Sequence, residues 1–254
     1  MSDVVTVSTD AGVMTITINR PEAKNAVNRA VAVAIAAAVD KLDGDDSIRA
    51  AILTGAGKSF CAGMDLKAFV SGELPVVEGR GFAGIAEAPP KKPIIAAVEG
   101  FALAGGFELA ITCDLIVAAD NSRFGIPEVK RGLVAAGGGL IRLPKQIPTR
   151  LAMELALTGD FISAQRAYDI GLINRVVPAG TALEQARELA RTIVDNGPLA
   201  VAATKQVLTE VDSWPEDEKF KRQTDIVMPV FMSADAIEGS SAFAEKRKPD
   251  WQGK

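Results

Sequence analysis

Two glutamates with contrasting surroundings are the residues best suited to acid–base chemistry. Glu108 lies in the first turn of an apolar segment, residues 107–113, and Glu128 follows twenty residues later, after a second apolar run. An ionised carboxylate in apolar surroundings is costly unless it has a partner or a task. Two carboxyl groups in one such pocket have raised, mutually coupled pKa values and share a proton near neutral pH. The alternative is that both are solvated surface charges.

A glycine pair just before Glu108 is the second chemical feature. Residues 93–98 form a short apolar run that predicts a buried strand, Gly100 ends it, and Gly105-Gly106 opens a helix. Glycine lets a ligand approach the main chain closely, and the first N–H groups of a helix have no internal partner. The turn is therefore a candidate site for negative charge, although these glycines would also serve simple packing.

The absence of histidine narrows the chemistry further. It excludes Ser-His-Asp and Cys-His hydrolases and most transition-metal sites. Cys61 and Cys113 do not form a C-x-x-C pair, so neither a zinc ribbon nor a redox motif is indicated, and no metal site is expected. The single tyrosine, Tyr168, lies in an ordinary helical segment. Carboxylates are therefore the expected agents of any acid–base catalysis near neutral pH.

Composition limits the partners and the compartment. The 254 residues suit one large domain, or a domain with a helical extension, and 48% of them are apolar. A net charge of −4 without a basic stripe disfavours nucleic-acid binding. No uncharged apolar span of membrane length and no signal pattern is present, so a cytoplasmic protein without a membrane partner is expected. Two cysteines in so long a chain are expected to be free thiols in a reducing compartment.

Strands and helices alternate through the first two thirds of the chain, which predicts an α/β core. Expected strands lie at 4–9, 13–19, 50–54, 93–98, 115–118 and 172–177, and expected helices at 28–42, 105–113, 149–158 and 163–170. A strand–strand–helix unit recurs at 4–42, 50–68, 94–113 and 115–140. Residues 71–84 contain glycines and a proline without periodicity, and a mobile loop or lid is expected there.

The rest of the chain is helical. Helices are expected at 183–196, 199–211, 216–228 and 233–245, with breaks at Gly197-Pro198 and Trp214-Pro215. A core domain at 1–195 that carries the site, and a helical region at 196–254, are therefore expected. These helices have no strands to cover, so they should dock on the core or on neighbouring subunits, and residues 227–231 are the patch expected to be buried.

Several motifs together resemble the signature of the crotonase (enoyl-CoA hydratase/isomerase) family. The matching stretches are Phe-Cys-Ala-Gly-Met-Asp-Leu at 60–66, Glu-Gly-Phe-Ala-Leu-Ala-Gly-Gly-Phe-Glu-Leu-Ala at 99–110, Cys-Asp at 113–114, Phe-Gly-Ile-Pro-Glu at 124–128 and Gly-Leu-Ile-Asn-Arg-Val-Val at 171–177. The ending at 243–249 is also similar to family C-termini. The resemblance implies a crotonase-type spiral of ββα units, with C-terminal helices that assemble homotrimers, often paired into hexamers.

The resemblance also implies a hydro-lyase chemistry, the reversible addition of water to a 2-enoyl-CoA thioester. The enolate would be held by two backbone N–H groups, which correspond to Met64 and Gly105; Ala104 replaces one glycine of the family's Gly-Gly-Gly. Glu128 would protonate the α-carbon, while Glu108 would orient and activate the water. Coenzyme A enters only as part of the acyl-CoA substrate, and neither a metal nor another cofactor is implied.

The same resemblance implies a coenzyme A site. Backbone contacts to adenine are implied around residues 62–65, and contacts to phosphates from lysines, including Lys246 of a neighbouring subunit. The implied substrate-binding residues in one chain are Lys24, Ala62, Asp65, Leu66, Lys67 and Gly106. For each lysine the alternative is a solvated surface charge.

Other activities stay open at this stage. Residues 105–110 with 140–144 also resemble carnitinyl-CoA dehydratases, and isomerases and hydrolases of the same fold share the expected oxyanion hole. A non-catalytic acyl-CoA binding protein is the alternative of another class. Residues 133–137 stand where hydratases commonly carry a proline-containing turn, a departure that affects the shape of the pocket rather than the chemistry.

Overall fold

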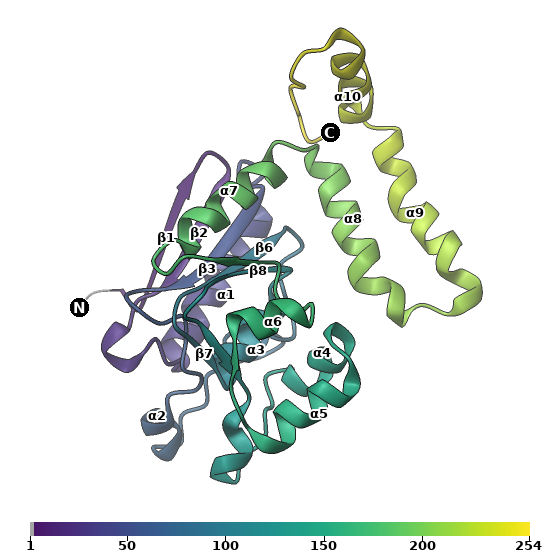
Figure 1. Cartoon of the computed structure of the whole chain (residues 1–254). Helices are drawn as coiled ribbons and strands as arrows, with labels where there is room; N and C mark the ends of the chain where they lie inside the picture. Colours follow the sequence, from purple (N-terminus) through teal and green to yellow (C-terminus); the bar gives the residue numbers. More distant parts are fainter. Residues whose placement is uncertain (1–2) are drawn as a thin grey trace.

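A six-stranded sheet forms the centre of the core in the computed structural model, which describes residues 3–254 (Figure 1). The strand order is β1-β2-β3-β6-β8-β11. The hairpin of β1 (Val5–Asp10) and β2 (Val13–Ile18) is antiparallel, whereas β2, β3 (Ala50–Gly55), β6 (Ile94–Val98), β8 (Leu115–Ala119) and β11 (Arg175–Val177) run parallel. The predicted α/β core is therefore correct.

Both faces of the sheet are buried, which is why its central strands are apolar without alternation. In β3, Ala51 and Leu53 belong to the larger core with α1 (Arg29–Gly44) and α3 (Gly105–Thr112). The intervening Ala50 and Ile52 belong to a second core beneath α7 (Ala182–Val194). Side chains of a strand alternate between faces, so the four-residue apolar run at 50–53 supplies both layers.

Helix α7 lies across the sheet in Figure 1 and approaches it through a stripe of small residues. Ala182, Ala186 and Ala190 recur at four-residue spacing and are fully buried against the strands. The start of the helix is held by Glu99, whose carboxylate accepts hydrogen bonds from Gly180 N (3.1 Å) and Ala182 N (3.0 Å). This contact supplies partners for N–H groups that a helix leaves unpaired.

A second, three-stranded sheet has the order β10-β9-β7. It consists of β7 (Phe101–Leu103), β9 (Arg123–Gly125) and β10 (Ile162–Ser163), and β7 runs parallel to β9. The expected ββα units at 4–42, 94–113 and 115–140 each contain two strands and a helix. The expected unit at 50–68 differs, because its second strand is reduced to two isolated bridges, one between Cys61 and Ala102 and one between Met64 and Val27.

The remaining elements of the core are short and surround this second sheet. They are η1 (Pro21–Ala23), α2 (Leu66–Val70), η2 (Pro127–Arg131), α4 (Gly139–Gln146), α5 (Thr149–Thr158) and α6 (Ala164–Asp169). The helix expected at 149–158 is found at those bounds. The strand expected at 172–177 is only β11, because Leu172 N bonds back to Ala167 O (2.8 Å) and closes α6.

The segment 71–84 is partly regular. An antiparallel ribbon joins β4 (Val76–Val77) to β5 (Gly81–Phe82), and Ala83 N donates to Pro75 O (2.9 Å). Gly84 (φ +70°) lies so close to α1 that an added Cβ would be 2.2 Å from Ala32 O. Residues 75–84 thus form a tight ribbon packed on a helix, and the expectation of a mobile loop or lid stays a prediction.

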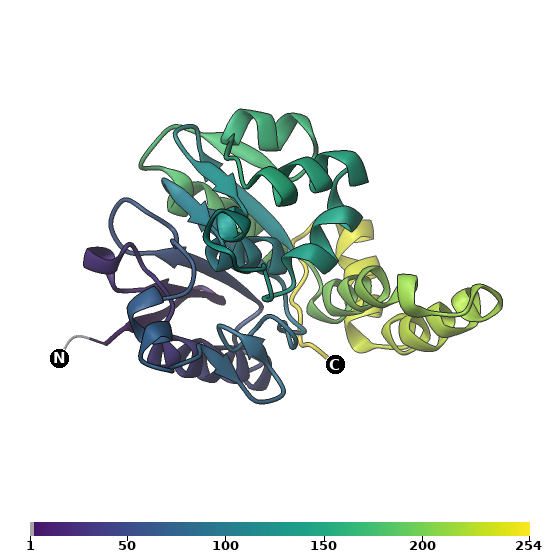
Figure 2. The same ribbon diagram turned by 90° about the horizontal axis from the view of Figure 1, so that it is seen from below.

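The C-terminal helices extend away from the core as an arm (Figures 1 and 2). The arm contains α8 (Pro198–Glu210), η3 (Val211–Ser213), η4 (Glu216–Glu218), α9 (Lys219–Phe231) and α10 (Ala234–Glu245). Lys205 Nζ ties α8 to the core through Asp114 Oδ2 (2.6 Å) and Lys92 O (3.0 Å). The arm leaves the core at the expected Gly197-Pro198 break.

The end of the chain returns to the place where the arm begins. Trp251 Nε1 donates to Asp195 O (2.8 Å), and Arg49 Nη2 donates to Trp251 O (3.2 Å). The buried Asp235 carboxylate of α10 accepts from Gln252 N (2.7 Å). These contacts fix both ends of the arm at one point of the core.

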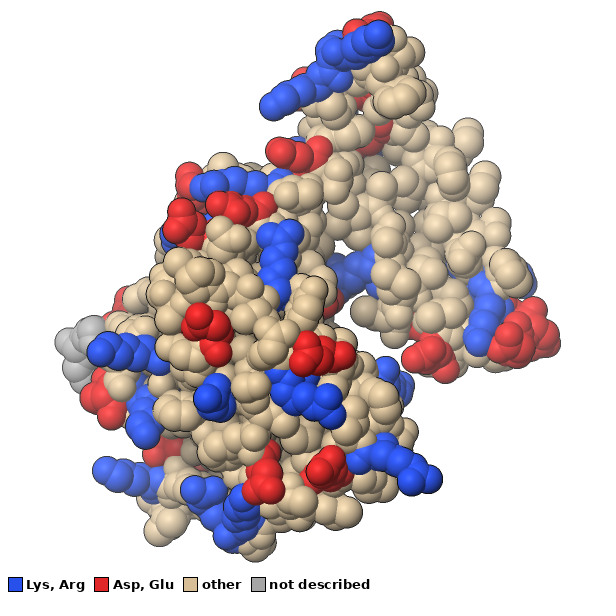
Figure 3. Space-filling model, in the orientation of Figure 1, with Lys and Arg blue, Asp and Glu red and all other residues tan. Residues whose placement is uncertain are grey.

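The surface carries charges of both signs without a continuous patch of either on the face seen in Figure 3. On that face the charged side chains of the arm gather near its tip and around α10, and the surface between these two places is mostly uncharged. Arm residues Phe220, Phe231, Met232 and Phe243 are each more than two-thirds exposed in the single chain. Residues 227–231, which were expected to be buried, are thus not covered by the chain itself.

Overpacking the α7 stripe tests this account of the sheet. Ala186→Leu forces extra methylene groups against strands that have no space for them, so we expect the free energy of unfolding to fall by about 1–3 kcal/mol in urea titrations. Arg187→Leu, on the exposed side of the same helix, should stay within about 0.5 kcal/mol of wild type. Equal stabilities of the two variants would contradict the packing.

Candidate active site

Parallel pairing of two short strands brings Glu108 and Glu128 together. Strands β7 and β9 pair in register, with Leu103 opposite Gly125, and Ala104 N continues the pairing by donating to Gly125 O (2.9 Å). Because the carboxyl ends of parallel strands lie at one edge of a sheet, α3 and η2 start side by side. Glu108 is in the first turn of α3 and Glu128 in the first turn of η2. The residues between the two glutamates form the rest of α3, strands β8 and β9, and the turns that connect them.

A cavity of about 720 Å³ opens over this edge. Its volume and mostly apolar walls are typical of a small-molecule site. The walls come from α2, the β4–β5 ribbon, the start of α3, η2 and residues 133–137. The residues singled out from the sequence that line it are Lys24, Ala62, Met64, Leu66, Gly105, Glu108 and Glu128.

Direct backbone packing places Met64 next to Gly105. Cys61 N donates to Phe101 O (2.9 Å) and Leu103 N donates to Cys61 O (3.1 Å), so residues 61–64 run along β7. A Cβ on Gly106 would be 2.1 Å from Cys61 O, and one on Gly63 would be 3.0 Å from Gly105 N. Only glycine permits these approaches. Within residues 3–254, no hydrogen bond is formed by the N–H group of Met64 or of Gly105.

Ala104 holds the turn before α3 in a backbone conformation that favours glycine. Its angles are φ +52° and ψ −131°. A residue in such a region costs on the order of 1–3 kcal/mol and persists only where the surroundings enforce it. Here the hydrogen bonds of Ala104 N to Gly125 O and of Glu108 N to Ala104 O (3.0 Å) enforce it. The strain fixes the direction of the Gly105 N–H group.

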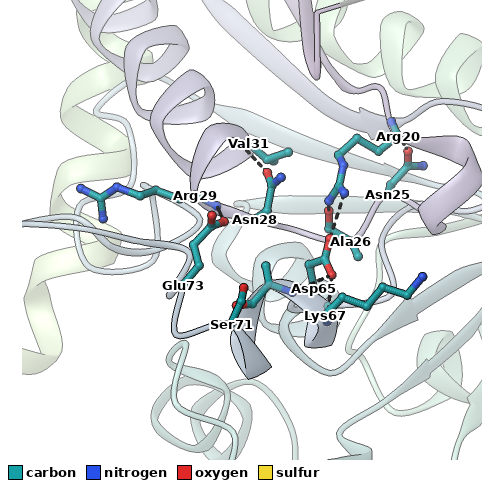
Figure 4. A network of polar contacts seen from close by, with 12 residues as sticks. Arg20, Asn25, Ala26, Asn28, Arg29, Val31, Asp65, Lys67, Ser71 and Glu73 are labelled. Atoms are coloured by element: carbon teal, nitrogen blue, oxygen red, sulfur yellow. Dashed lines mark hydrogen bonds and ion pairs between the residues drawn. The ribbon is translucent and has the colours of Figure 1, made fainter.

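Polar contacts anchor the segment that carries Met64, as Figure 4 shows. The Asp65 carboxylate caps α2 by accepting from Lys67 N (3.1 Å) and Ala68 N (3.3 Å), and it pairs with Arg20 Nη2 (2.8 Å). Arg20 and the N–H donors hold the pKa of Asp65 below its usual value despite desolvation, which acts in the opposite direction. The carboxylate is thus fully engaged within the protein.

Glu108 is a buried carboxylate that still has partners for its charge. It is 3% exposed, and its Oε1 accepts from Gly139 N (2.8 Å). Burial raises its pKa, whereas the N–H groups of Gly139 and Gly137 and the charge of Arg142 act to lower it. A Cβ on Gly137 would be 2.8 Å from Glu108 Oε2, so this carboxylate needs glycine in the loop before α4.

Glu128 has less support for a negative charge. Among the buried side-chain oxygens and nitrogens of residues 3–254, its Oε2 is the one atom without a hydrogen-bond partner. Burial, with a smaller contribution from the Glu108 carboxylate, raises the pKa of Glu128 to about 7, although its own N–H group and Arg131 act to lower it. The two carboxyl groups therefore differ: one is supported as an anion, and the other holds a proton near neutral pH.

Three of the residues implied for coenzyme A make other contacts. Asp65, Lys67 and Gly106 do not line the cavity. Asp65 is the cap of α2, Lys67 is exposed on that helix, and Gly106 packs on Cys61. Lys24 does lie at the rim, with Nζ 5.7 Å from the centre of the Phe101 ring. Their assignment to substrate binding remains a prediction.

Some residues of the site were not singled out from the sequence, and Phe82, Glu87 and Arg142 are among them. Phe82 of the ribbon and Glu87 after it line the cavity. Arg142 of α4 lies behind Glu108, and its guanidinium donates to Ala86 O. No motif marks these residues, although an arginine within the apolar start of α4 is a signal of the same kind as Glu108. Each is brought to the site by tertiary packing of segments far apart in the chain.

The described residues, 3–254, contain neither a metal-ligand cluster nor a membrane-spanning helix. In that range no group of three or more His, Cys, Asp or Glu side chains is arranged to hold a metal ion. No helix there combines the length and apolarity that crossing a membrane requires.

Comparison with known proteins identifies the family. The sequence profile described as enoyl-CoA hydratase/isomerase matches residues 8–254. The chain is 46% identical to enoyl-CoA hydratase EchA19 of Mycobacterium tuberculosis over 93% of this chain and 92% of that protein. It is 41% identical to the carnitinyl-CoA dehydratase of Salmonella typhi over the full length of both. The chain belongs to the enoyl-CoA hydratase/isomerase family.

A solved structure agrees with this family assignment. The crystal structure of enoyl-CoA hydratase EchA1 from Mycobacterium marinum superposes with a TM-score of 0.98 at 59% identity, over the full length of both chains. The resemblance to the crotonase family and the crotonase-type fold, both predicted from sequence motifs, are thereby confirmed.

The raised pKa of Glu128 predicts a pH-dependent stability. Because Glu128 keeps its proton in the folded state up to about pH 7, whereas the unfolded chain loses it near pH 4.5, the fold loses stability as the pH rises from about 4.5 to about 7, and this contribution is constant outside that window. Between pH 5 and pH 8 the free energy of unfolding of wild type should therefore fall by about 1–3 kcal/mol more than that of Glu128→Gln. Urea titrations at both pH values measure this difference.

Glu184→Gln serves as the control, since Glu184 is exposed on α7. It should follow the pH dependence of wild type. If Glu128→Gln also follows wild type, Glu128 does not carry a raised pKa in the folded protein.

Proposed function

We propose that this chain is an enoyl-CoA hydratase, a hydro-lyase that adds water reversibly to a 2-enoyl-CoA thioester. One observation carries the proposal: two unlike carboxyl groups, Glu108 and Glu128, share an apolar cavity with the free N–H groups of Met64 and Gly105. This set contains an oxyanion site, a base and an acid. Water addition to a conjugated thioester requires all three.

The two N–H groups would bind the thioester oxygen. When water adds to the β-carbon, negative charge moves to this oxygen, and donors fixed in a dry site stabilise it without reorganisation. Gly105 adds the start of α3, where the helix dipole favours negative charge. Losing one such donor typically costs about 10²–10³ in rate. The strained Ala104 would keep the Gly105 donor aimed at the oxygen.

The carboxyl groups would divide the proton transfers. Glu108, supported as an anion by Gly139 N, takes a proton from water as the water oxygen bonds to the β-carbon. Glu128, protonated near neutral pH, gives its proton to the α-carbon as the enolate collapses. One proton enters the pair as one leaves it, so the pair carries a single proton before and after the reaction. Transfer of that proton from Glu108 to Glu128 resets the site.

Coenzyme A would enter as part of the substrate. Ala62 and Leu66 line the cavity beside Met64, and Lys24 at its rim offers a positive charge for a phosphate. This chemistry needs no metal and no other cofactor, because backbone donors and carboxylates supply each step. Two buried free thiols, Cys61 and Cys113, are compatible with a cytoplasmic location, where the environment is reducing.

We also propose that the chain divides into a catalytic core at 1–195 and an assembly region at 196–254, and that it forms a homotrimer or a pair of trimers. The arm encloses an apolar groove of about 700 Å³ lined by residues including Ala203, Val227, Phe231 and Phe243. Exposed apolar surface of this kind marks association sites. In such an assembly Lys246, at the end of α10, would face a neighbouring subunit's coenzyme A.

A specialised acyl group is the second candidate, as in the carnitinyl-CoA dehydratase relatives. The observation that favours it is Glu87, a carboxylate on the cavity wall near Phe82. Negative charge beside an aromatic ring suits a quaternary ammonium group, which a carnitinyl chain carries. Turnover of carnitinyl-CoA faster than of any plain 2-enoyl-CoA would select this reading.

Hydration of crotonyl-CoA tests the main proposal. Purified protein should abolish the enoyl-thioester absorbance, and Glu108→Gln and Glu128→Gln should each lower kcat by about 10²–10⁴, because each removes one proton transfer. Glu87→Gln is the matched control and should retain near wild-type activity on this uncharged acyl group. Thioester binding without turnover in wild type would instead indicate a non-catalytic acyl-CoA binding protein or a specialised substrate.

The oxyanion donor at Gly105 is a poor target for mutation. A Cβ at this position would lie 2.4 Å from Phe82 Cζ, so any side chain there would displace the Phe82 ring in addition to its effect on the N–H donor. The glutamates give the clearer result, since Gln has nearly the same shape as Glu.

The assembly proposal has its own test. Phe231→Asp places a charge in the apolar groove and should shift the protein, in sedimentation velocity, from an oligomer toward the 26.6 kDa monomer. Glu22→Lys, an exposed charge change on the core, should not. A wild-type protein that sediments as a monomer would refute the assembly.

A further inference from the structure

The ring of Phe82 occupies the wall of the cavity closest to the reacting groups. A Cβ on Gly105 would be 2.4 Å from Phe82 Cζ and 2.8 Å from Cε1, so the tip of the ring points at the α-carbon of Gly105. A Cβ on Gly137 would be 3.1 Å from Phe82 Cδ1 and 2.8 Å from Glu108 Oε2. The ring and the Glu108 carboxylate therefore lie side by side.

The backbone on both sides of Phe82 is held against the core. Phe82 pairs with Val76 in the ribbon, and its carbonyl oxygen accepts from Ala86 N (3.1 Å). Two residues later the chain touches α1 at Gly84, where no side chain fits. The ring itself packs partly on the main hydrophobic core. Its position is thus set by contacts on both ends of β5, and a swing of the whole ribbon would break them.

The proposed function assigns coenzyme A to the rim beside Lys24, whose Nζ lies 5.7 Å from the centre of the Phe101 ring. Leu66 and Phe69 of α2 line the same cavity. A thioester oxygen held at Met64 N and Gly105 N, with its reacting carbons between Glu108 and Glu128, would direct the acyl chain away from that rim. The first group beyond the β-carbon then meets Phe82.

We propose that Phe82 is a specificity-determining residue that restricts this enzyme to short, unbranched acyl chains. This inference rests on the proposed enoyl-CoA hydratase function. It names the substrate class: 2-enoyl-CoA thioesters with little bulk beyond the β-carbon. Because hydrophobic pockets discriminate by about 10–200-fold per methylene group that does not fit, one ring at this position is sufficient.

A chain-length series with two variants tests the proposal. The kcat/KM of wild type, Phe82→Ala and Phe82→Leu is measured with crotonyl-CoA, 2-hexenoyl-CoA and 2-decenoyl-CoA. The kcat/KM of wild type should be at least about 10-fold higher with crotonyl-CoA than with 2-decenoyl-CoA. Phe82→Ala should raise the ratio of kcat/KM for 2-decenoyl-CoA to kcat/KM for crotonyl-CoA by about 10-fold or more. Phe82→Leu preserves an apolar side chain, so its preference should lie between those of wild type and Phe82→Ala. This variant replaces Phe82→Ala in the test if the alanine variant folds poorly.

Phe69→Ala is the matched control, because Phe69 is another aromatic residue of the same cavity and belongs to α2 rather than to the ribbon. It should change kcat/KM for all three substrates by the same factor. A wild-type enzyme that hydrates 2-decenoyl-CoA as well as crotonyl-CoA overturns the proposal and leaves the hydratase function intact. So does a Phe69→Ala variant with the same change in preference as Phe82→Ala.

Binding of saturated analogues separates failure of this proposal from failure of the proposed function. If wild type hydrates none of the three thioesters, the hydratase function is refuted for plain acyl groups. The affinities of butanoyl-CoA and decanoyl-CoA, measured by calorimetry, then decide the role of Phe82. A gain of about 10-fold or more for decanoyl-CoA over butanoyl-CoA in Phe82→Ala supports the restriction, and an unchanged ratio refutes it.

Discussion

The close contact between two backbone segments, 61–64 and 103–106, is the constraint on which the site depends. Gly106 lies against the carbonyl of Cys61 at a distance that leaves no space for a Cβ, and Gly63 does the same toward Gly105. Two stretches forty residues apart thereby place their N–H groups at one wall of a cavity. A methyl group at either glycine would separate these donors, although neither glycine contacts a ligand itself.

The same edge of the small sheet solves the problem of placing two carboxylates in an apolar cavity. Repulsion and desolvation oppose two negative charges there. The chain gives Glu108 a backbone donor and leaves an oxygen of Glu128 without one, so the pair is stable with one proton rather than none. In a sequence without histidine, this difference between two glutamates supplies a group that titrates near neutral pH.

Local patterns in the sequence predict the long elements well, and tertiary pairing explains the rest. The helix at 149–158 is bounded by Pro148 and by Gly159, whose φ of +65° ends it, so the local sequence determines both ends of this helix. Strands β7 and β9 have three residues each and exist because they pair with one another. The ribbon at 76–82 likewise depends on α1. Of the site, the glutamates stand out by type and spacing, whereas Phe82 and Arg142 arrive through contacts that no periodicity encodes.

The position of the last residues has a consequence for assembly. Trp251 and the residues after it join the end of the chain to the point where the arm leaves the core, and Lys205 braces the first arm helix against the strands. Both ends of the three-helix arm are thus attached to the core, so the orientation of the arm is fixed before a second copy binds. A partner would meet a surface that is already ordered, and the entropy lost in ordering the arm belongs to folding rather than to association.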